Sequence, residues 1–151
     1  MSNISSKCLP IVFLCLSLAG CTSESGLTPF VGEGCSLLPD ASLINEQDWC
    51  ECCVEHNIAY WQGGTEQKRE RVDTALMRCV YLKTNNHEFP HALFEGARFG
   101  GSPYFHDWYR WGYGWPKERM FQALTDDEKN QAMDLLADYR ASKQSVCKTS
   151  L

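Results

Sequence analysis

The sequence lacks three features: an apolar run long enough to cross a bilayer, an internal repeat and an excess of positive charge. Its most apolar stretch, Leu9 to Gly20, has the length of a signal-peptide core and is too short for a membrane-spanning helix. Lysine and arginine number 14 against 19 acidic residues, a formal net charge of −5. This balance argues against binding to nucleic acid and against docking on anionic lipid by charge alone. A chain of 151 residues suits one domain.

Residues 1–20 are expected to be a lipoprotein signal peptide. The apolar core ends in Leu18-Ala19-Gly20-Cys21, which resembles the lipobox of bacterial lipoproteins. The resemblance implies cleavage before Cys21 and a lipid on that cysteine. Because Thr22 rather than an aspartate follows, it favours the outer membrane, with the domain in the periplasm or at the cell surface. The alternative is an ordinary secretory peptide with a chance cysteine.

After cleavage we expect a flexible, lipidated tether at 21–31 and a single folded domain at 32–151. Export would also place the cysteines in an oxidising compartment, where an even number is typical of a disulfide framework. Binding of a metal by the thiolates is the less favoured alternative. The cysteines that remain for the domain are Cys35, Cys50, Cys52, Cys53, Cys79 and Cys147.

Helix signals occur in three places. The first helix should run from about Trp49 to Gln62, capped by Asn45 or Asp48 and ended by Gly63-Gly64. A second should run from about Glu66 to Leu82, after Thr65 as its N-cap, and the short connection predicts an antiparallel pair. The capping box of Thr125 and Glu128 opens a third, which should reach about Ser142.

Residues 87–118 show no clean period, and we expect loops and short turns there. Between Gly96 and Trp115, eight aromatic residues are mixed with five glycines. Such a run either fills the core of a small domain, which we favour, or faces lipid. Arg98 and Arg110 suit a salt bridge or stacking more than a lipid phosphate. The predicted fold class is therefore mainly α: a disulfide-linked antiparallel helix pair, a C-terminal helix and an aromatic-rich loop region.

Chemistry is concentrated around His56. Residues four apart share a helix face, so Cys52, His56 and Tyr60 should form one stripe. If Cys52 and Cys79 are bonded, Asp73 of the second helix arrives opposite His56, because the helices run in opposite directions. A carboxylate beside an imidazole orients a general base, and Tyr60 can donate to the same carboxylate. The alternative is a structural histidine bonded to Asp73.

These residues resemble the active site of secreted phospholipase A2. Cys52-Cys53-Val54-Glu55-His56, followed by Tyr60, is similar to the family's first active-site helix, and Asp73 lies six residues before Cys79 as in its second. The run from Arg110 to Pro116 resembles a bacterial branch of that superfamily, and Gly32 to Cys35 is a looser match to its calcium loop. The firm match covers about residues 52–80.

The resemblance implies an enzyme in which His56 takes a proton from water, Asp73 orients it and Tyr60 braces Asp73. The water would attack the sn-2 ester of a glycerophospholipid, releasing a fatty acid and a lysophospholipid. It further implies a calcium ion near Gly32, Gly34 and Asn57. The implied bridges are Cys52–Cys79 and Cys35–Cys53; Cys50 and Cys147 remain, and their pairing is left open. The domain is expected to be a monomer whose partner is a phospholipid membrane.

Asn57 departs from the family, which has an aspartate calcium ligand at this place. Loss of one carboxylate weakens calcium affinity strongly, unless abundant calcium or a nearby carboxylate compensates. The carboxylates considered are Glu33, Asp40, Asp48 and Glu55. The first hypothesis is therefore a phospholipase A2-type hydrolase, and the second is a catalytically inactive relative that binds lipid or a partner protein. A purely structural envelope lipoprotein is third, because it leaves the phasing of His56 and Asp73 to chance.

Overall fold

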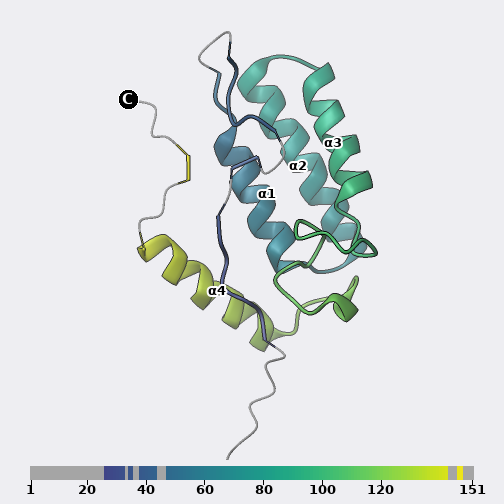
Figure 1. Cartoon of the computed structure of the whole chain (residues 1–151), viewed down its shortest axis with the longest axis vertical. Coiled ribbons are helices and arrows are strands. Elements are labelled where there is room, and N and C mark those ends of the chain that lie inside the picture. The colour runs from purple at the N-terminus through teal and green to yellow at the C-terminus, as the bar shows by residue number, and fades with distance from the viewer. Residues whose placement is uncertain (1–25, 33, 36–37, 44–46, 143–145, 148–151) are drawn as a thin grey trace, which may run out of the picture.

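The computed structural model describes residues 26–32, 34–35, 38–43, 47–142 and 146–147. Over these residues the chain is mainly helical, with four α-helices, one short 3-10 helix and no strand (Figure 1). None of the helices so described combines the length and the apolar content that crossing a bilayer requires. The expected signal peptide, the lipidation residue Cys21, Glu33 and the candidate cap Asn45 lie outside the described residues.

Helix α1 (Cys50–Gln62) begins one residue after the predicted start and ends at the predicted residue. Trp49 is the N-cap residue and makes no side-chain cap hydrogen bond. Asp48, one of the two predicted caps, lies one residue earlier and accepts the backbone N–H of Cys50 through its Oδ1 at 2.8 Å. At the other end Gly63 adopts a φ of 66°, a left-handed value at which the Cβ of another residue would be strained. The helix that carries His56 is thus fixed at both ends by local chemistry.

Helix α2 (Glu66–Thr84) runs antiparallel to α1. As predicted, Thr65 caps its start by accepting a hydrogen bond from the N–H of Lys68. The helix ends two residues later than predicted, where Asn85 takes a left-handed φ of 49°. Asparagine adopts this conformation more readily than most residues, so Asn85 is suited to end the helix.

Helix α3 (Glu88–Gly100) lies where we expected loops, and that prediction is wrong. Pro90 falls in the first turn, where its missing N–H would have had no partner within the helix. The side-chain oxygen of Asn86 accepts the N–H groups of Glu88 and Phe89 and so caps the start. Leu93 is buried in the core, and this packing outweighs the low helix propensity of the glycines.

Helix α4 (Asp126–Ala141) follows a short 3-10 helix, η1 (Lys117–Arg119). The predicted capping box is present in both directions, because Thr125 accepts from the N–H of Glu128 and Glu128 accepts from the N–H of Thr125. In Figure 1, α1, α2 and α3 stand side by side, and α4 lies apart from them beside the N-terminal segment.

Helix α1 lies between two apolar clusters. The first joins α1, α2 and α3 and consists of Cys35, Trp49, Cys52, Cys53, Leu76, Val80 and Leu93. The second joins the opposite face of α1 to the N-terminal segment, the aromatic loop and α4, and consists of Leu27, Phe30, Ile58, Trp61, Trp115 and Ala132. Burial on both sides holds α1 more firmly than packing on one face would.

Residues 26–31 belong to the folded domain, which corrects the expected tether at 21–31. Leu27 and Phe30 are buried in the second cluster. Thr28 donates its backbone N–H to Gly114 and accepts the indole N–H of Trp61 through its carbonyl. Apolar residues and a proline in a short polar stretch gave no periodic signal, so only their tertiary contacts reveal their place.

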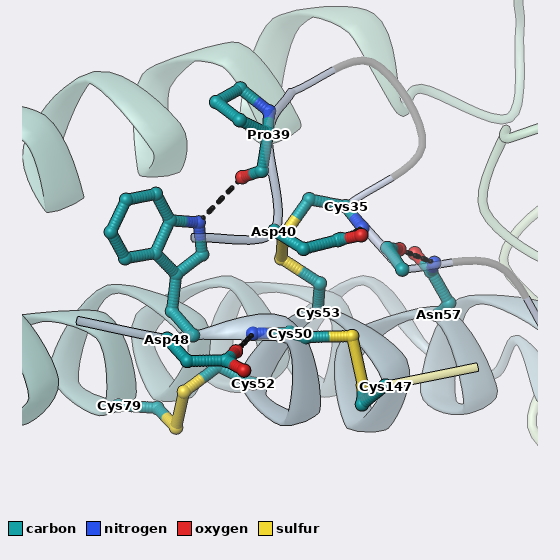
Figure 2. Close-up of a disulfide and its surroundings, with 12 residues drawn as sticks. Cys35, Pro39, Asp40, Asp48, Cys50, Cys52, Cys53, Asn57, Cys79 and Cys147 are labelled. Carbon is teal, nitrogen blue, oxygen red and sulfur yellow. Dashed lines mark hydrogen bonds between the residues drawn. A yellow bond between two sulfur atoms is a disulfide. The ribbon is translucent and has the colours of Figure 1, made fainter. Parts of the chain in front are cut away.

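Three disulfides join these parts: Cys35–Cys53, Cys50–Cys147 and Cys52–Cys79. Cys35–Cys53 and Cys52–Cys79 are the pairings that the resemblance implied, and Cys50–Cys147 joins the two cysteines whose pairing was left open. Two of them tie α1 outward, one to the preceding loop and one to the C-terminal segment, and the third links α1 to α2 (Figure 2). All three therefore converge on the first turn of α1.

Candidate active site

His56 and Asp73 face each other across the α1–α2 pair. The distance from His56 Nε2 to Asp73 Oδ1 is 2.9 Å. The bridge between the same two helices joins Cys52, which precedes His56 in α1, to Cys79, which follows Asp73 in α2. The order of the two contacts is reversed between the helices, as an antiparallel pair requires. The side chain of His56 is 11% exposed, whereas that of Asp73 is fully buried.

The buried carboxylate of Asp73 has four partners. Tyr60 donates its hydroxyl to Oδ1 at 2.8 Å, on the side of His56. Arg98 donates to Oδ2 at 3.0 Å, and Arg69 approaches that oxygen to 3.9 Å. A buried charge is tolerated when it is paired and hydrogen-bonded, and Asp73 is both.

Tyr60 acts as a neutral brace in this arrangement. Its hydroxyl donates to Asp73 and accepts a hydrogen bond from Arg69 Nε at 3.1 Å. Burial, reinforced by the negative charge of Asp73, raises the pKa of Tyr60 above its ordinary value of 10.0. The phenol therefore stays protonated at neutral pH and holds the carboxylate rather than taking a proton itself.

Arg69 was missed by the sequence reasoning, because it lies within a run of charged and polar residues at 66–71. Its side chain is buried and also donates to the backbone carbonyls of Ala97 and Arg98, at the end of α3. The signal was its spacing, because residue 69 shares the helical stripe of Asp73, Leu76 and Val80. Arg98 makes the salt bridge that the sequence favoured over a phosphate contact.

A groove of about 390 Å³ opens beside His56. It is mainly apolar, and its walls come from α1, α2, α3 and the loops around them. Among its lining residues are Leu38, Leu76, Leu93, Gly96, Gly100 and Tyr109. A larger hollow of about 750 Å³ lies between α2 and α3 and contains neither His56 nor Asp73, so it offers no comparable chemistry.

The two histidines that border this larger hollow, His87 and His91, are exposed. They belong to no metal-binding group among the described residues, and His91 lies within α3. His91 instead approaches Glu95 to 3.9 Å, a surface pair one turn along the helix.

The aromatic run divides between core and surface. Trp111 and Trp115 are buried, and their indole N–H groups donate to the carbonyls of Gly64, just after α1, and of Gln62, its last residue. Arg110 is also buried and donates to three backbone carbonyls of this loop, so its role is structural. Exposed members of the run are Phe99, Tyr104, Phe105 and Trp108.

The residues expected near calcium make contacts with other parts of the chain in the structure. Asn57 Nδ2 donates a hydrogen bond to the carbonyl of Gly34 at 2.8 Å, which places a donor where a cation would need an oxygen. A Cβ on Gly32 would overlap the hydroxyl of Tyr139, so this glycine packs against α4. Within the described part of the chain, no group of three or more acidic, histidine or cysteine side chains suits a metal.

The carboxylates considered as substitutes have other roles or lie elsewhere. Asp40 accepts the backbone N–H of Cys35 at 2.6 Å, and Asp48 accepts that of Cys50 at 2.8 Å. Glu55 is exposed on α1.

Comparison of the chain with protein-family models, with curated proteins and with solved structures gave no match.

Proposed function

We propose that this protein is a membrane-anchored hydrolase of the phospholipase A2 type, which cleaves the sn-2 ester of glycerophospholipids. The observation that carries the proposal is the 2.9 Å contact between His56 and the buried carboxylate of Asp73, at the wall of an apolar groove. The helix pair, its disulfide and the phenolic brace of Tyr60 support a phospholipase A2-like arrangement.

The tautomer of neutral His56 follows from its partner. A carboxylate only accepts hydrogen bonds, so His56 Nε2 carries the proton and Nδ1 holds the lone pair. A water between Nδ1 and the ester carbonyl would lose its proton to Nδ1 as its oxygen adds to the carbonyl carbon. Collapse of the tetrahedral intermediate breaks the ester bond, and the proton passes from Nδ1 to the departing lysophospholipid oxygen.

The groove and its surroundings suit a substrate with acyl chains. Its described walls are mainly apolar, and Gly96 and Gly100 leave room along α3. Apolar side chains are exposed nearby: Val31 and Trp108 border an adjoining hollow that also touches Asn57, and Leu38 borders the groove itself. Tryptophan suits the interface between lipid and water, which supports a phospholipid membrane as the partner.

The leader supports a location at the bacterial outer membrane. Removal of residues 1–20 takes away one basic residue, Lys7, and changes the net charge from −5 to −6. Such a domain would be repelled by anionic lipid, so its residence there would depend on a lipid on Cys21 and on exposed apolar side chains.

The second candidate is a catalytically inactive relative that binds lipid or a partner protein through the same groove. One contact favours it: Asn57 donates to Gly34 in the place where the family has a calcium-ligand aspartate. The inherited pair of His56 and Asp73 would then be structural.

Fatty-acid release from phospholipid vesicles tests the proposal. His56→Gln should lower the rate about a hundredfold or more, because a positioned general base contributes at least that much. Gly96→Leu should also lower it, since a Cβ there meets no atom within 4 Å and a longer side chain would extend into the groove. His91→Leu, outside the groove on the same helix, is the matched control.

If the wild-type protein releases fatty acid and His56→Gln releases it at the same rate, His56 is not the general base. Vesicle binding without any release, weakened by Gly96→Leu but not by His91→Leu, would instead identify the inactive relative.

A further inference from the structure

The loop before α1 is attached to that helix by a hydrogen bond from Asn57. Its Nδ2 donates to the carbonyl of Gly34 at 2.8 Å (Figure 2). The neighbouring residue in the loop, Cys35, is bonded to Cys53 of α1. One covalent and one polar contact therefore fix adjacent loop residues to successive turns of the same helix.

The orientation of the Asn57 amide is set by chemistry. A backbone carbonyl offers only lone pairs, so the atom that faces it at 2.8 Å must be a donor. The nitrogen must therefore point to Gly34, since the amide oxygen in its place would be repelled.

Asp40 provides further contacts that hold this loop, to Cys35 and to Trp49. Its Oδ1 accepts the N–H of Cys35 at 2.6 Å, and its backbone carbonyl accepts the N–H of Trp49 at 3.0 Å. A Cβ on Gly34 would overlap the Asp40 carboxylate, so the glycine makes room for it. The negative charge of Asp40 is thus compensated in part by the N–H of Cys35, which lies beside the Gly34 carbonyl that Asn57 contacts.

An aspartate at position 57 would replace the attraction between Asn57 and the Gly34 carbonyl by repulsion. Its carboxylate would face the Gly34 carbonyl, oxygen against oxygen, with a second carboxylate, that of Asp40, next to the same glycine. Two oxygens in that relation are stabilised by a cation between them, and calcium accepts oxygen ligands at about 2.3–2.6 Å.

We propose that the Asn57 amide takes the place of a cation in this protein, so that the loop is closed on α1 without calcium. The corollary is that Asn57→Asp converts the same loop into one that closes only when calcium is bound. The proposal concerns the loop and holds whether or not His56 hydrolyses an ester.

Amide hydrogen exchange at Cys35 measures this closure locally, because its N–H is protected by Asp40. The full chain with its disulfides formed is compared as wild type, Asn57→Asp and Asn57→Ala, each in EDTA and in millimolar calcium chloride. Wild-type protection should be the same in both. In Asn57→Asp, the protection of the Cys35 N–H should fall about tenfold or more in EDTA and should return in calcium. A change of that size corresponds to one charge-assisted contact.

Asn57→Ala is the control for loss of the bond alone, and its protection should fall in both solutions without rescue. Protection in the wild type that rises on addition of calcium would overturn the proposal. So would an Asn57→Asp variant whose exchange at Cys35 is identical in EDTA and in calcium. If Asn57→Asp folds only with calcium, the thermal unfolding midpoint reports the same dependence and supports the proposal.

Discussion

Arg98 Nη1 lies 3.0 Å from Asp73 Oδ2, the carboxylate oxygen opposite the one that His56 and Tyr60 contact. Arg69 approaches the same oxygen to 3.9 Å from the preceding turn of α2. One oxygen of Asp73 therefore serves the imidazole and the phenol, and the other faces two guanidinium groups. This division keeps a fully buried negative charge compensated while it orients His56.

Removal of the Asp73 charge should be more damaging than removal of one of its partners. Asp73→Asn leaves buried Arg69 without a counter-charge and should cost about 3–5 kcal/mol of unfolding free energy. Arg98→Gln removes one hydrogen bond from a partly exposed side chain and should cost about 1–3 kcal/mol. Urea unfolding measures both, with exposed Arg78→Gln as a control expected within about 0.5 kcal/mol of wild type.

An equal cost for the Asp73 and Arg98 variants would show that the carboxylate is not the centre of this network.

Two glycines near the site should respond oppositely to alanine. In Gly101→Ala the new Cβ would overlap the ring of Tyr60, and the protein should lose about 1–3 kcal/mol of stability. In Gly96→Ala the Cβ enters open space within α3, and stability should rise by up to about 1 kcal/mol because alanine favours the helix. Thermal unfolding of the pair decides the matter, and a stable Gly101→Ala variant would mean that Tyr60 is loosely held.

The disulfides should separate stability from site geometry. Replacing Cys52 and Cys79 together by alanine opens a loop of 27 residues and should cost about 3 kcal/mol as well as hydrolytic rate. Replacing Cys50 and Cys147 opens one of 97 residues, so the loss of stability should be at least as large, but the rate of the folded protein should persist. Equal losses of rate in both variants would show that the α1–α2 bridge does not position His56 and Asp73.

The start of α4 should weaken in acid. The hydrogen bond from Arg119, followed by that from Thr125, lowers the pKa of Glu128 from 4.5 to about 2. Because the folded value is the lower one, the stabilisation is present above about pH 4.5 and is lost as the pH falls toward about 2. Unfolding free energies across this range should fall for the wild type and fall less for Glu128→Gln. Parallel profiles would exclude Glu128 as a source of the acid sensitivity.

Much of the fold was predictable because the ends of the helices carry local signals. Asp48, Gly63, Thr65 and the capping box at Thr125 act on the helix ends right beside them, so their effects can be read from sequence. Helix α3 has no such clarity, since its glycines and Pro90 argue against a helix and its stability comes from packing on α2. Tertiary contact overrode propensity there.

The candidate site was predictable where spacing alone determines geometry. His56, Tyr60 and Asp73 meet because helical periodicity places them on facing stripes of a pair joined at Cys52 and Cys79. The contact of Asn57 with Gly34 joins a helix to an irregular loop, and no periodicity governs such a loop. Arg69 was obscured by its charged neighbours, because composition does not tell which member of a polar run turns inward.

The bridge between Cys50 and Cys147 makes most of the domain a covalent ring. A single cut by a protease at any peptide bond inside that ring would leave both fragments in one molecule. Nicked protein should therefore migrate as one species on a non-reducing gel and separate only after thiol treatment. Exposed loops such as the one around Trp108 can be cleaved without releasing the helix that carries His56.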